Sequence, residues 1–237
     1  MPKIKQMMKA RTGHWFENHL DDLMMKRIED GQERRANSGK KHFRPSEVHG
    51  CPRALWYSRK GYIKSLPSVR GARRMHMGTV IHEYVDSLLA ESDILESAEV
   101  LVGGDDLEIP IVGAYDAILF HTKDKEKILV LAEFKSKSDS DYYKVMPHPS
   151  HVIQWNLYAY LTGVEEGFIW YMNKNDQKYE TYDLTVDYAI RDELLTKLRD
   201  VQKYVDNDEH YPYQPEENHF FCDFQKQCES DYFLEGK

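Results

Sequence analysis

Six side chains in four short segments of the 237-residue chain have types and spacings that could act together at one site. The segments are GTVIH, GAYD, EFK and QWNLY, and the side chains are His82, Asp116, Glu133, Lys135, Gln154 and Tyr158. Carboxylate oxygens with one imidazole suit Mg²⁺ or Mn²⁺. Such an ion can polarise a phosphodiester and lower the pKa of a bound water, and a lysine can orient that water. The chemistry predicted from these residues is therefore metal-dependent hydrolysis.

Each segment also has a purely structural interpretation when it is taken alone. Alternation along a strand places Glu133 and Lys135 on one face and Phe134 on the other, so the first two can simply form a salt bridge. His82 follows Gly78 by one helical turn, and a single histidine is often an ordinary core residue. The ordered combination weakens these alternatives, because Gln154 and Tyr158 lie four apart and share one helix face.

The hydrophobic pattern predicts the elements that must position these side chains. We expect helices over 14–29, 69–91, 148–161 and 187–205, and a further helix that begins at an N-cap at Ser46. We expect a loop or mobile arm over 33–44. Strands are expected within 96–136, 167–173 and 178–186. Short β-branched runs between helices predict an α/β fold with helical flanks. We divide the chain into an N-terminal helix with a basic arm (1–45) and a single domain (46–237).

Charge is distributed unevenly along the chain. Residues 1–80 contain 18 Lys and Arg against 7 Asp and Glu, although the net charge of the whole chain is −8. The overall acidity argues against a protein that coats nucleic acid without specificity. The basic first third nevertheless predicts a surface that faces phosphates. The alternative is an ordinary charged face exposed to solvent. No apolar run is long enough to predict a membrane span, and no signal peptide is recognisable, so we expect a cytoplasmic protein without membrane contact.

The ordered motifs resemble those of the PD-(D/E)xK nuclease superfamily, in its RecB-like branch, over roughly residues 46–230. The resemblance implies a restriction-endonuclease-like mixed central β-sheet flanked by helices. It also implies that His82, Asp116, Glu133 and the carbonyl of Phe134 bind Mg²⁺ or Mn²⁺. Lys135 would position or activate the attacking water, with Glu133 and Asp116 as its catalytic partners. Gln154 and Tyr158 would contact the DNA strand.

Three cysteines form a second constellation that converges from both ends of the chain. Cys51 lies near the N-terminus, and His219, Cys222 and Cys228 form an H-x-x-C-x-x-x-x-x-C run near the C-terminus. This pattern resembles the iron–sulfur nucleases of the AddB type and the CRISPR-associated Cas-four type, except that His219 replaces a cysteine. The resemblance implies a 4Fe–4S cluster, whereas the Cys₃His ligand set is typical of structural Zn²⁺. A site without metal is the third alternative. With either cofactor we expect the two ends of the chain to be joined there.

Basic and aromatic residues near these elements indicate a nucleic-acid groove. Arg53, Arg73 and Arg74 are the arginines that we expect to bind substrate, since a single strand is typically held by cations at its phosphates and rings at its bases. A basic helix face packed over by its own aromatics is the alternative.

The sequence thus predicts a metal-dependent DNA exonuclease that acts on single-stranded ends, in recombination, repair or CRISPR adaptation and with possible protein partners there. The alternative function is a non-hydrolytic end-binding subunit that retains the fold.

Overall fold

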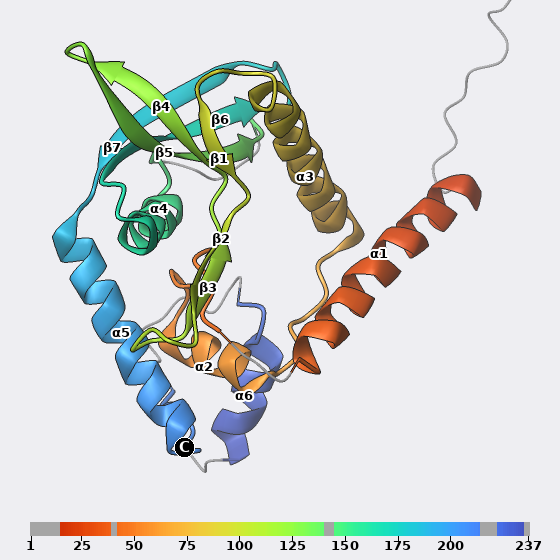
Figure 1. Cartoon of the computed structure of the whole chain (residues 1–237). Coiled ribbons are helices and arrows are strands. Elements are labelled where there is room, and N and C mark those ends of the chain that lie inside the picture. The colour runs from red at the N-terminus through yellow and green to blue at the C-terminus, as the bar shows by residue number, and fades with distance from the viewer. Residues whose placement is uncertain (1–14, 39–41, 140–144, 214–221, 235–237) are drawn as a thin grey trace, which may run out of the picture.

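The computed structural model describes residues 15–38, 42–139, 145–213 and 222–234 (Figure 1). The helices are α1 (Trp15–Ala36), α2 (Pro52–Lys60), α3 (Val69–Leu89), α4 (Pro149–Thr162), α5 (Tyr188–Asp206) and α6 (Gln225–Leu234). The strands are β1 (Leu95–Ala98), β2 (Leu101–Gly104), β3 (Ile111–Ala114), β4 (Ala117–Lys123), β5 (Glu126–Lys137), β6 (Glu166–Asn173) and β7 (Tyr179–Thr185). Within these ranges, no helix combines the length and the apolar character that a bilayer span requires.

A five-stranded sheet forms the centre of the molecule, in the order β1-β4-β5-β6-β7. Only β5 and β6 pair in parallel, and α4 connects them along the chain. Helix α4 packs on one face of this sheet around Trp155 and Tyr158, and α3 covers the other face through Val85 and Leu89. The predicted α/β fold with a mixed central sheet and helical flanks is therefore confirmed.

Local sequence signals account for the ends of the helices that carry site residues. Helix α4 begins with Pro149 in its first turn after the N-cap His148, and Gly163 ends it in the left-handed conformation. Ser68 caps α3 by accepting a hydrogen bond from the N–H of Gly71. These two helices match the ranges predicted from the sequence to within two residues.

Two predicted boundaries near the N-terminus are wrong. Helix α2 is capped by Cys51 rather than by Ser46, because Pro52 occupies its first position and Cys51 Sγ accepts the N–H of Ala54 at 3.3 Å. Helix α1 continues to Ala36, so the first residues of the predicted loop are helical. The run Glu33–Ala36 consists of good helix formers, which outweighs its lack of apolar residues.

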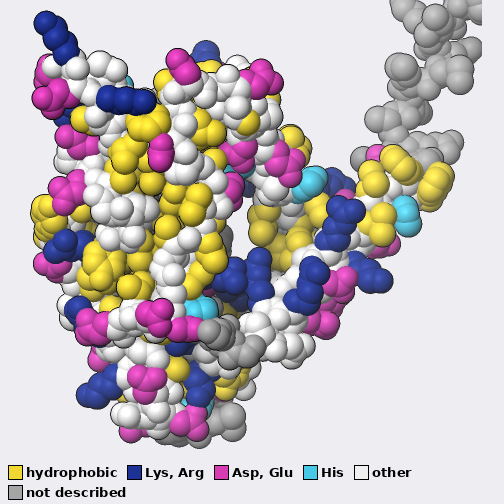
Figure 2. All heavy atoms as spheres, in the orientation of Figure 1, with side chains coloured by type: hydrophobic (Ala, Val, Ile, Leu, Met, Phe, Trp, Pro, Cys, Tyr) yellow, Lys and Arg dark blue, Asp and Glu magenta, His cyan; other side chains and the backbone are white. Residues whose placement is uncertain are grey.

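A further apolar cluster joins segments from both ends of the chain. Trp56 and Tyr57 of α2 pack with Leu198 of α5 and with Phe224 and Cys228 at the C-terminal end. Helix α1, in contrast, has no buried residue; it contacts α3 and stands apart from the main body (Figures 1 and 2). The N- and C-terminal helical segments thus meet beside the central sheet, as the sequence predicts, and α1 remains an exposed arm.

Candidate metal centre

The candidate site lies where the chain passes twice between the central sheet and the β2-β3 hairpin. Strand β1 pairs with β4 and β2 pairs with β3, so the connections β1–β2 and β3–β4 run beside each other. The first connection contains Glu99 and the second contains Asp116, and the N–H of Glu99 donates to the carbonyl oxygen of Asp116 at 3.1 Å. The pattern IVGAYDAILF predicts a single strand that includes Asp116, but in the structure Asp116 lies between β3 and β4.

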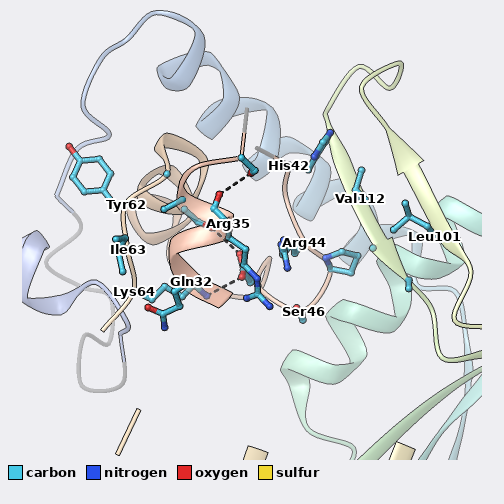
Figure 3. A pocket seen from close by; sticks show the side chains of 18 of the residues that line it. Gln32, Arg35, His42, Arg44, Ser46, Tyr62, Ile63, Lys64, Leu101 and Val112 are labelled. Atoms are coloured by element: carbon cyan, nitrogen blue, oxygen red, sulfur yellow. Dashed lines mark hydrogen bonds and ion pairs between the residues drawn. The ribbon is translucent and has the colours of Figure 1, made fainter. Parts of the chain in front are cut away.

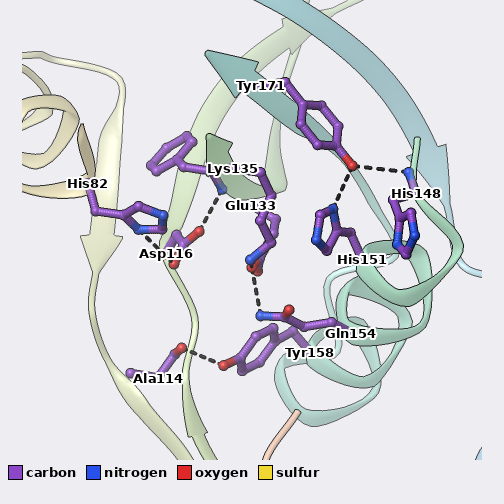
Figure 4. Close-up of polar contacts among 11 residues, drawn as sticks. His82, Ala114, Asp116, Glu133, Lys135, His148, His151, Gln154, Tyr158 and Tyr171 are labelled. Atoms are coloured by element: carbon purple, nitrogen blue, oxygen red, sulfur yellow. Dashed lines mark hydrogen bonds and ion pairs between the residues drawn. The ribbon is translucent and has the colours of Figure 1, made fainter. Parts of the chain in front are cut away.

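His82, Glu99 and Asp116 converge from three separate parts of the chain. Each offers one ligand atom, and these atoms all lie within 4.8 Å of one another. His82 reaches the site from α3, with its Nδ1 3.6 Å from Asp116 Oδ1 (Figure 4). Asp116 Oδ2 accepts the N–H of Phe134 at 2.5 Å, which fixes the orientation of the carboxylate. The sequence predicted His82 and Asp116 but missed Glu99, because that residue belongs to no recognisable spacing pattern.

Strand β5 supplies the second half of the site. Glu133 and Lys135 form an ion pair on one face of the strand, while Phe134 packs on the opposite face with Ala132 and Trp170. Gln154 Nε2 of α4 donates to Glu133 Oε1 at 2.7 Å. The predicted alternation along β5 is confirmed. Glu133 is thus held by a cation and an amide, beside the group formed by His82, Glu99 and Asp116.

The hydroxyl of Tyr158 fastens the hairpin to α4. It donates to the carbonyl oxygen of Ala114 at 2.6 Å, at the end of β3 and two residues before Asp116 (Figure 4). Gly113 lies in the same place, where an added Cβ would come within 2.9 Å of Tyr158 Oη and 2.7 Å of Pro45. Glycine is therefore required for this close approach. Gln154 and Tyr158 position the site in this structure, and their contact with DNA stays a prediction.

Burial dominates the electrostatics of the two inner carboxyl groups. It raises the pKa of Asp116 to about 6, against the attraction of Lys135, and it raises the pKa of Glu133 to about 7, with a further upward effect from Asp116. Burial and Lys135 lower the pKa of His82, so its imidazole is neutral and has a lone pair for a metal. The donor set therefore fits a hard divalent cation, which would compensate carboxylates that are costly to ionise here.

A neighbouring carboxylate supports this fit. Asp86 lies one helical turn after His82 on α3, and its Oδ1 is buried without a hydrogen-bond partner among the described residues. A buried carboxylate oxygen without a partner is costly unless positive charge is close. The pKa of Asp86 is raised, chiefly by burial and against the influence of His82. Asp86 thus places a fourth oxygen-bearing group on the same side of the site.

Two histidines that the sequence left unassigned form contacts next to Lys135. His151 Nδ1 lies 2.7 Å from the hydroxyl of Tyr171, and the backbone N–H of His148 donates to the same hydroxyl at 3.1 Å (Figure 4). Burial lowers the pKa of His151 to about 3, and the charge of Lys135 adds to this effect. His151 is therefore neutral at physiological pH and links α4 to β6.

The three arginines predicted to bind substrate have different surroundings. Arg53 is only 1% exposed, and its Nε donates to the hydroxyl of Tyr57 inside the terminal apolar cluster. The prediction for Arg53 is therefore wrong, because a DNA phosphate cannot reach a guanidinium that the aromatic residues of α2 enclose. Arg73 is exposed on α3 and pairs with Asp21 of α1, and Arg74 follows it on the same helix. These two remain accessible to a strand that passes α3.

A pocket of about 340 Å³ extends from the end of α1 to Tyr158 (Figure 3). Its polar lining includes Arg35, Arg44 and Lys64, and its apolar lining includes Tyr62 and Val112. Proteins that bind single-stranded nucleic acids combine cationic and aromatic side chains in one groove. The pocket therefore leads from a basic surface to a residue that fastens the metal centre.

The cysteines lie in one region, as their pattern predicts. Cys51 and Cys222 line a common pocket of about 400 Å³ near the start of α2, and Cys228 of α6 is buried in the adjoining apolar cluster. The three sulfur atoms do not all lie within 4.8 Å of one another, and His219 lies outside the described residues. Soft thiolates are ligands that suit an iron–sulfur cluster or Zn²⁺, and whether this region holds a cluster, Zn²⁺ or no metal stays a prediction.

Cys228→Ser is expected to lower the melting temperature and to remove metal from this region. A ligand set that joins Cys51 to the C-terminal segment contributes its binding free energy to folding. The measurement is a thermal melt with elemental analysis of iron and zinc in both proteins, purified without oxygen. Glu229→Gln on the exposed side of α6 is the matched control. Equal metal content and equal melting of the serine variant and the wild type would show that Cys228 is not a ligand.

Comparison with known proteins places this geometry in a known fold. No family model and no curated protein matches the sequence. The crystal structure of SSO0001 matches at a TM-score of 0.56 and 17% identity, covering 91% of this chain and 98% of that one. The alkaline exonuclease LHK-Exo from Laribacter hongkongensis matches at 0.52 and 13%, and its complex with dAMP at 0.52 and 15%; both cover 71% of this chain and 89% of theirs. The chain therefore has the same fold as SSO0001 and this alkaline exonuclease.

Proposed function

We propose that the protein is a metal-dependent deoxyribonuclease of the PD-(D/E)xK type, in the RecB-like branch, which removes nucleotides from ends of single-stranded DNA. One observation carries the proposal. Ligand atoms of His82, Glu99 and Asp116 lie within 4.8 Å of one another beside the ion pair of Glu133 and Lys135. The fold shared with an alkaline exonuclease supports it, since that relative acts as an exonuclease and has a structure with dAMP.

Each residue of the site has a distinct proposed role in phosphodiester hydrolysis. His82, Asp116 and Glu133, with the carbonyl of Phe134, would hold Mg²⁺ or Mn²⁺. The ion, when bound, supplies positive charge to the scissile phosphate and lowers the pKa of water. Lys135 donates hydrogen bonds that can orient the attacking water. Gln154 keeps Glu133 in place, and Tyr158 holds the connection that carries Asp116.

The basic groove supports single-stranded DNA as the substrate. Arg35 and Arg44 line the pocket that ends at Tyr158, and Arg73 and Arg74 are placed on α3 beside the arm. A strand that follows these cations would reach the metal centre past a tyrosine ring.

We further propose that Cys51, His219, Cys222 and Cys228 hold a 4Fe–4S cluster, with Zn²⁺ as the alternative, in a structural role. The pathway would be DNA recombination, repair or CRISPR adaptation.

Wild-type protein is expected to release nucleotides from the ends of labelled single-stranded DNA when Mg²⁺ or Mn²⁺ is present. Chelator should stop this release, because the cation that the carboxylates would hold is the group that would polarise the scissile phosphate. The measurement compares linear single strands, linear duplexes and circular single strands of one sequence. Circular DNA is the control for end dependence. Cleavage that continues in chelator contradicts the metal assignment, and binding without cleavage of any substrate favours a non-hydrolytic end-binding protein.

A further inference from the structure

Glu99 occupies a backbone conformation that side chains rarely adopt. Its φ is 53°, in the left-handed region, which residues other than glycine seldom adopt because the Cβ is crowded there. The residue follows β1 at the point where the chain leaves the central sheet, and its N–H is fixed by the carbonyl oxygen of Asp116. This conformation holds an exposed carboxylate next to the buried Asp116, in a place that the fold alone does not require to be acidic.

The site has more negative than positive charge. Asp86, Glu99, Asp116 and Glu133 surround His82, and Lys135 is the cation that acts on both inner carboxylates. Lys135 is paired with Glu133, while the ligand atoms of His82, Glu99 and Asp116 meet within 4.8 Å of one another. Like charges held this close repel each other unless a cation lies among them. The arrangement is therefore unfavourable for the empty protein and suited to a divalent ion.

Glu133 and Glu99 differ in what their carboxylates already bind. Glu133 is fully buried and contacts both Lys135 and Gln154. Glu99 is exposed, and its carboxylate accepts no hydrogen bond from another described side chain. Among the described residues, the group of possible ligands that meets within 4.8 Å contains Glu99 and not Glu133.

We propose that Glu99 is a further ligand of the divalent cation and closes its coordination sphere on the solvent side. This inference rests on the proposed function, because it concerns the same cation. His82, Asp116 and Glu99 then hold the ion from α3 and from both connections between the sheets. Glu133 faces the ion from β5 while it keeps Lys135 in place. Asp86 adds negative charge behind His82.

Glu99→Gln is expected to weaken Mn²⁺ binding by about 10- to 100-fold, the range typical of a lost group around a bound metal. Isothermal titration with Mn²⁺ in the absence of DNA measures this directly. Glu96→Gln is the matched control, because Glu96 lies three residues earlier on β1, is exposed, and belongs to no ligand group among the described residues. The control should bind Mn²⁺ as the wild type does.

A second variant separates metal binding from folding. Glu99→Gly suits the left-handed backbone and removes the carboxylate, so the metal-free protein should melt at the same or a higher temperature than the wild type. Saturating Mn²⁺ should then raise the melting temperature of the wild type and of Glu96→Gln more than that of either Glu99 variant.

The outcomes distinguish this inference from the proposed function. Equal Mn²⁺ affinity of wild type, Glu99→Gln and Glu99→Gly overturns the assignment of Glu99, even if the wild type cleaves DNA. Loss of affinity in both Glu99 variants supports the assignment, even if no DNA is cleaved, and in that case it is the nuclease function that fails. A wild type that binds no Mn²⁺ overturns both.

Discussion

Asp116→Asn is expected to reduce DNA cleavage by about 1000-fold or more while DNA binding survives. Among the described residues, Asp116 is the carboxylate that contacts both His82 and the backbone of β5, so the proposed cation would not be held correctly without its charge. Loss of several kcal/mol of transition-state stabilisation corresponds to a loss of this size. Asparagine keeps the shape and can still accept the N–H of Phe134. Binding should persist, because the basic residues of the groove carry most of the attraction for phosphates.

The same variant is expected to stabilise the metal-free protein at high pH. The folded state raises the pKa of Asp116 to about 6 and that of Glu133 to about 7, above their ordinary values. Well below pH 4 both groups are protonated whether the chain is folded or unfolded, so no penalty arises. Between about pH 4 and the raised pKa values of about 6 and 7, the unfolded chain releases these protons while the folded chain keeps them, so stability falls as the pH rises, and the loss is complete above pH 7. Asparagine removes one of these groups.

The measurements are end-labelled DNA cleavage, a binding titration in chelator, and melts of metal-free protein from pH 5 to pH 8. The difference in melting temperature between variant and wild type should grow from pH 5 to about pH 7 and then level off. Asp93→Asn, at an exposed turn, is the matched control for both readouts. Cleavage at the wild-type rate by Asp116→Asn would remove this residue from the site, and a pH-independent melting difference would contradict the burial argument.

Lys135→Ala is expected to lower turnover by about 100- to 10,000-fold, the usual contribution of a positioned group that assists proton transfer. Its effect on Mn²⁺ affinity should be much smaller, because a protonated lysine has no lone pair for a metal. Part of the affinity will change, since Lys135 lowers the pKa values of Glu133 and Asp116 and its removal makes both harder to ionise.

Single-turnover rates and Mn²⁺ titrations, carried out on the same preparations at pH 8, separate these two effects. Lys127→Ala is the control on the exposed end of the same strand. If turnover and affinity fall by the same factor, Lys135 acts as a structural partner of Glu133 rather than as a group that orients water.

The sequence was sufficient where the signal is local. The alternation along β5 placed Glu133 and Lys135 on one face, and the four-residue spacing of Gln154 and Tyr158 placed both on one face of the predicted helix over 148–161. Long-range pairing was harder to predict. The hydrophobic pattern of residues 111–120 is that of one strand, but two sheets share it, and Asp116 lies at the change between them.

The errors have one physical cause, which is that burial depends on partners distant in sequence. Arg53 has the type and neighbours of a phosphate-binding residue, but Tyr57 and the C-terminal segment enclose it. Glu99 lies in a run of ordinary acidic and apolar residues, and only the bond between its N–H and Asp116 brings it to the site. Composition identifies neither case, because the burial of Arg53 depends on the C-terminal segment and the position of Glu99 depends on the pairing of the two connections between the sheets.

The meeting of both ends of the chain in one apolar cluster determines the order in which the protein can fold during synthesis. All strands lie within residues 95–185, so the central sheet can assemble once that stretch has left the ribosome. The cluster around Trp56 also needs Phe224 and Cys228, which emerge about forty residues later. Until then the aromatic residues of α2 lack the part of their packing that the C-terminal segment supplies. A chaperone that holds the first sixty residues would therefore protect the nascent chain during the interval when it is most prone to aggregate.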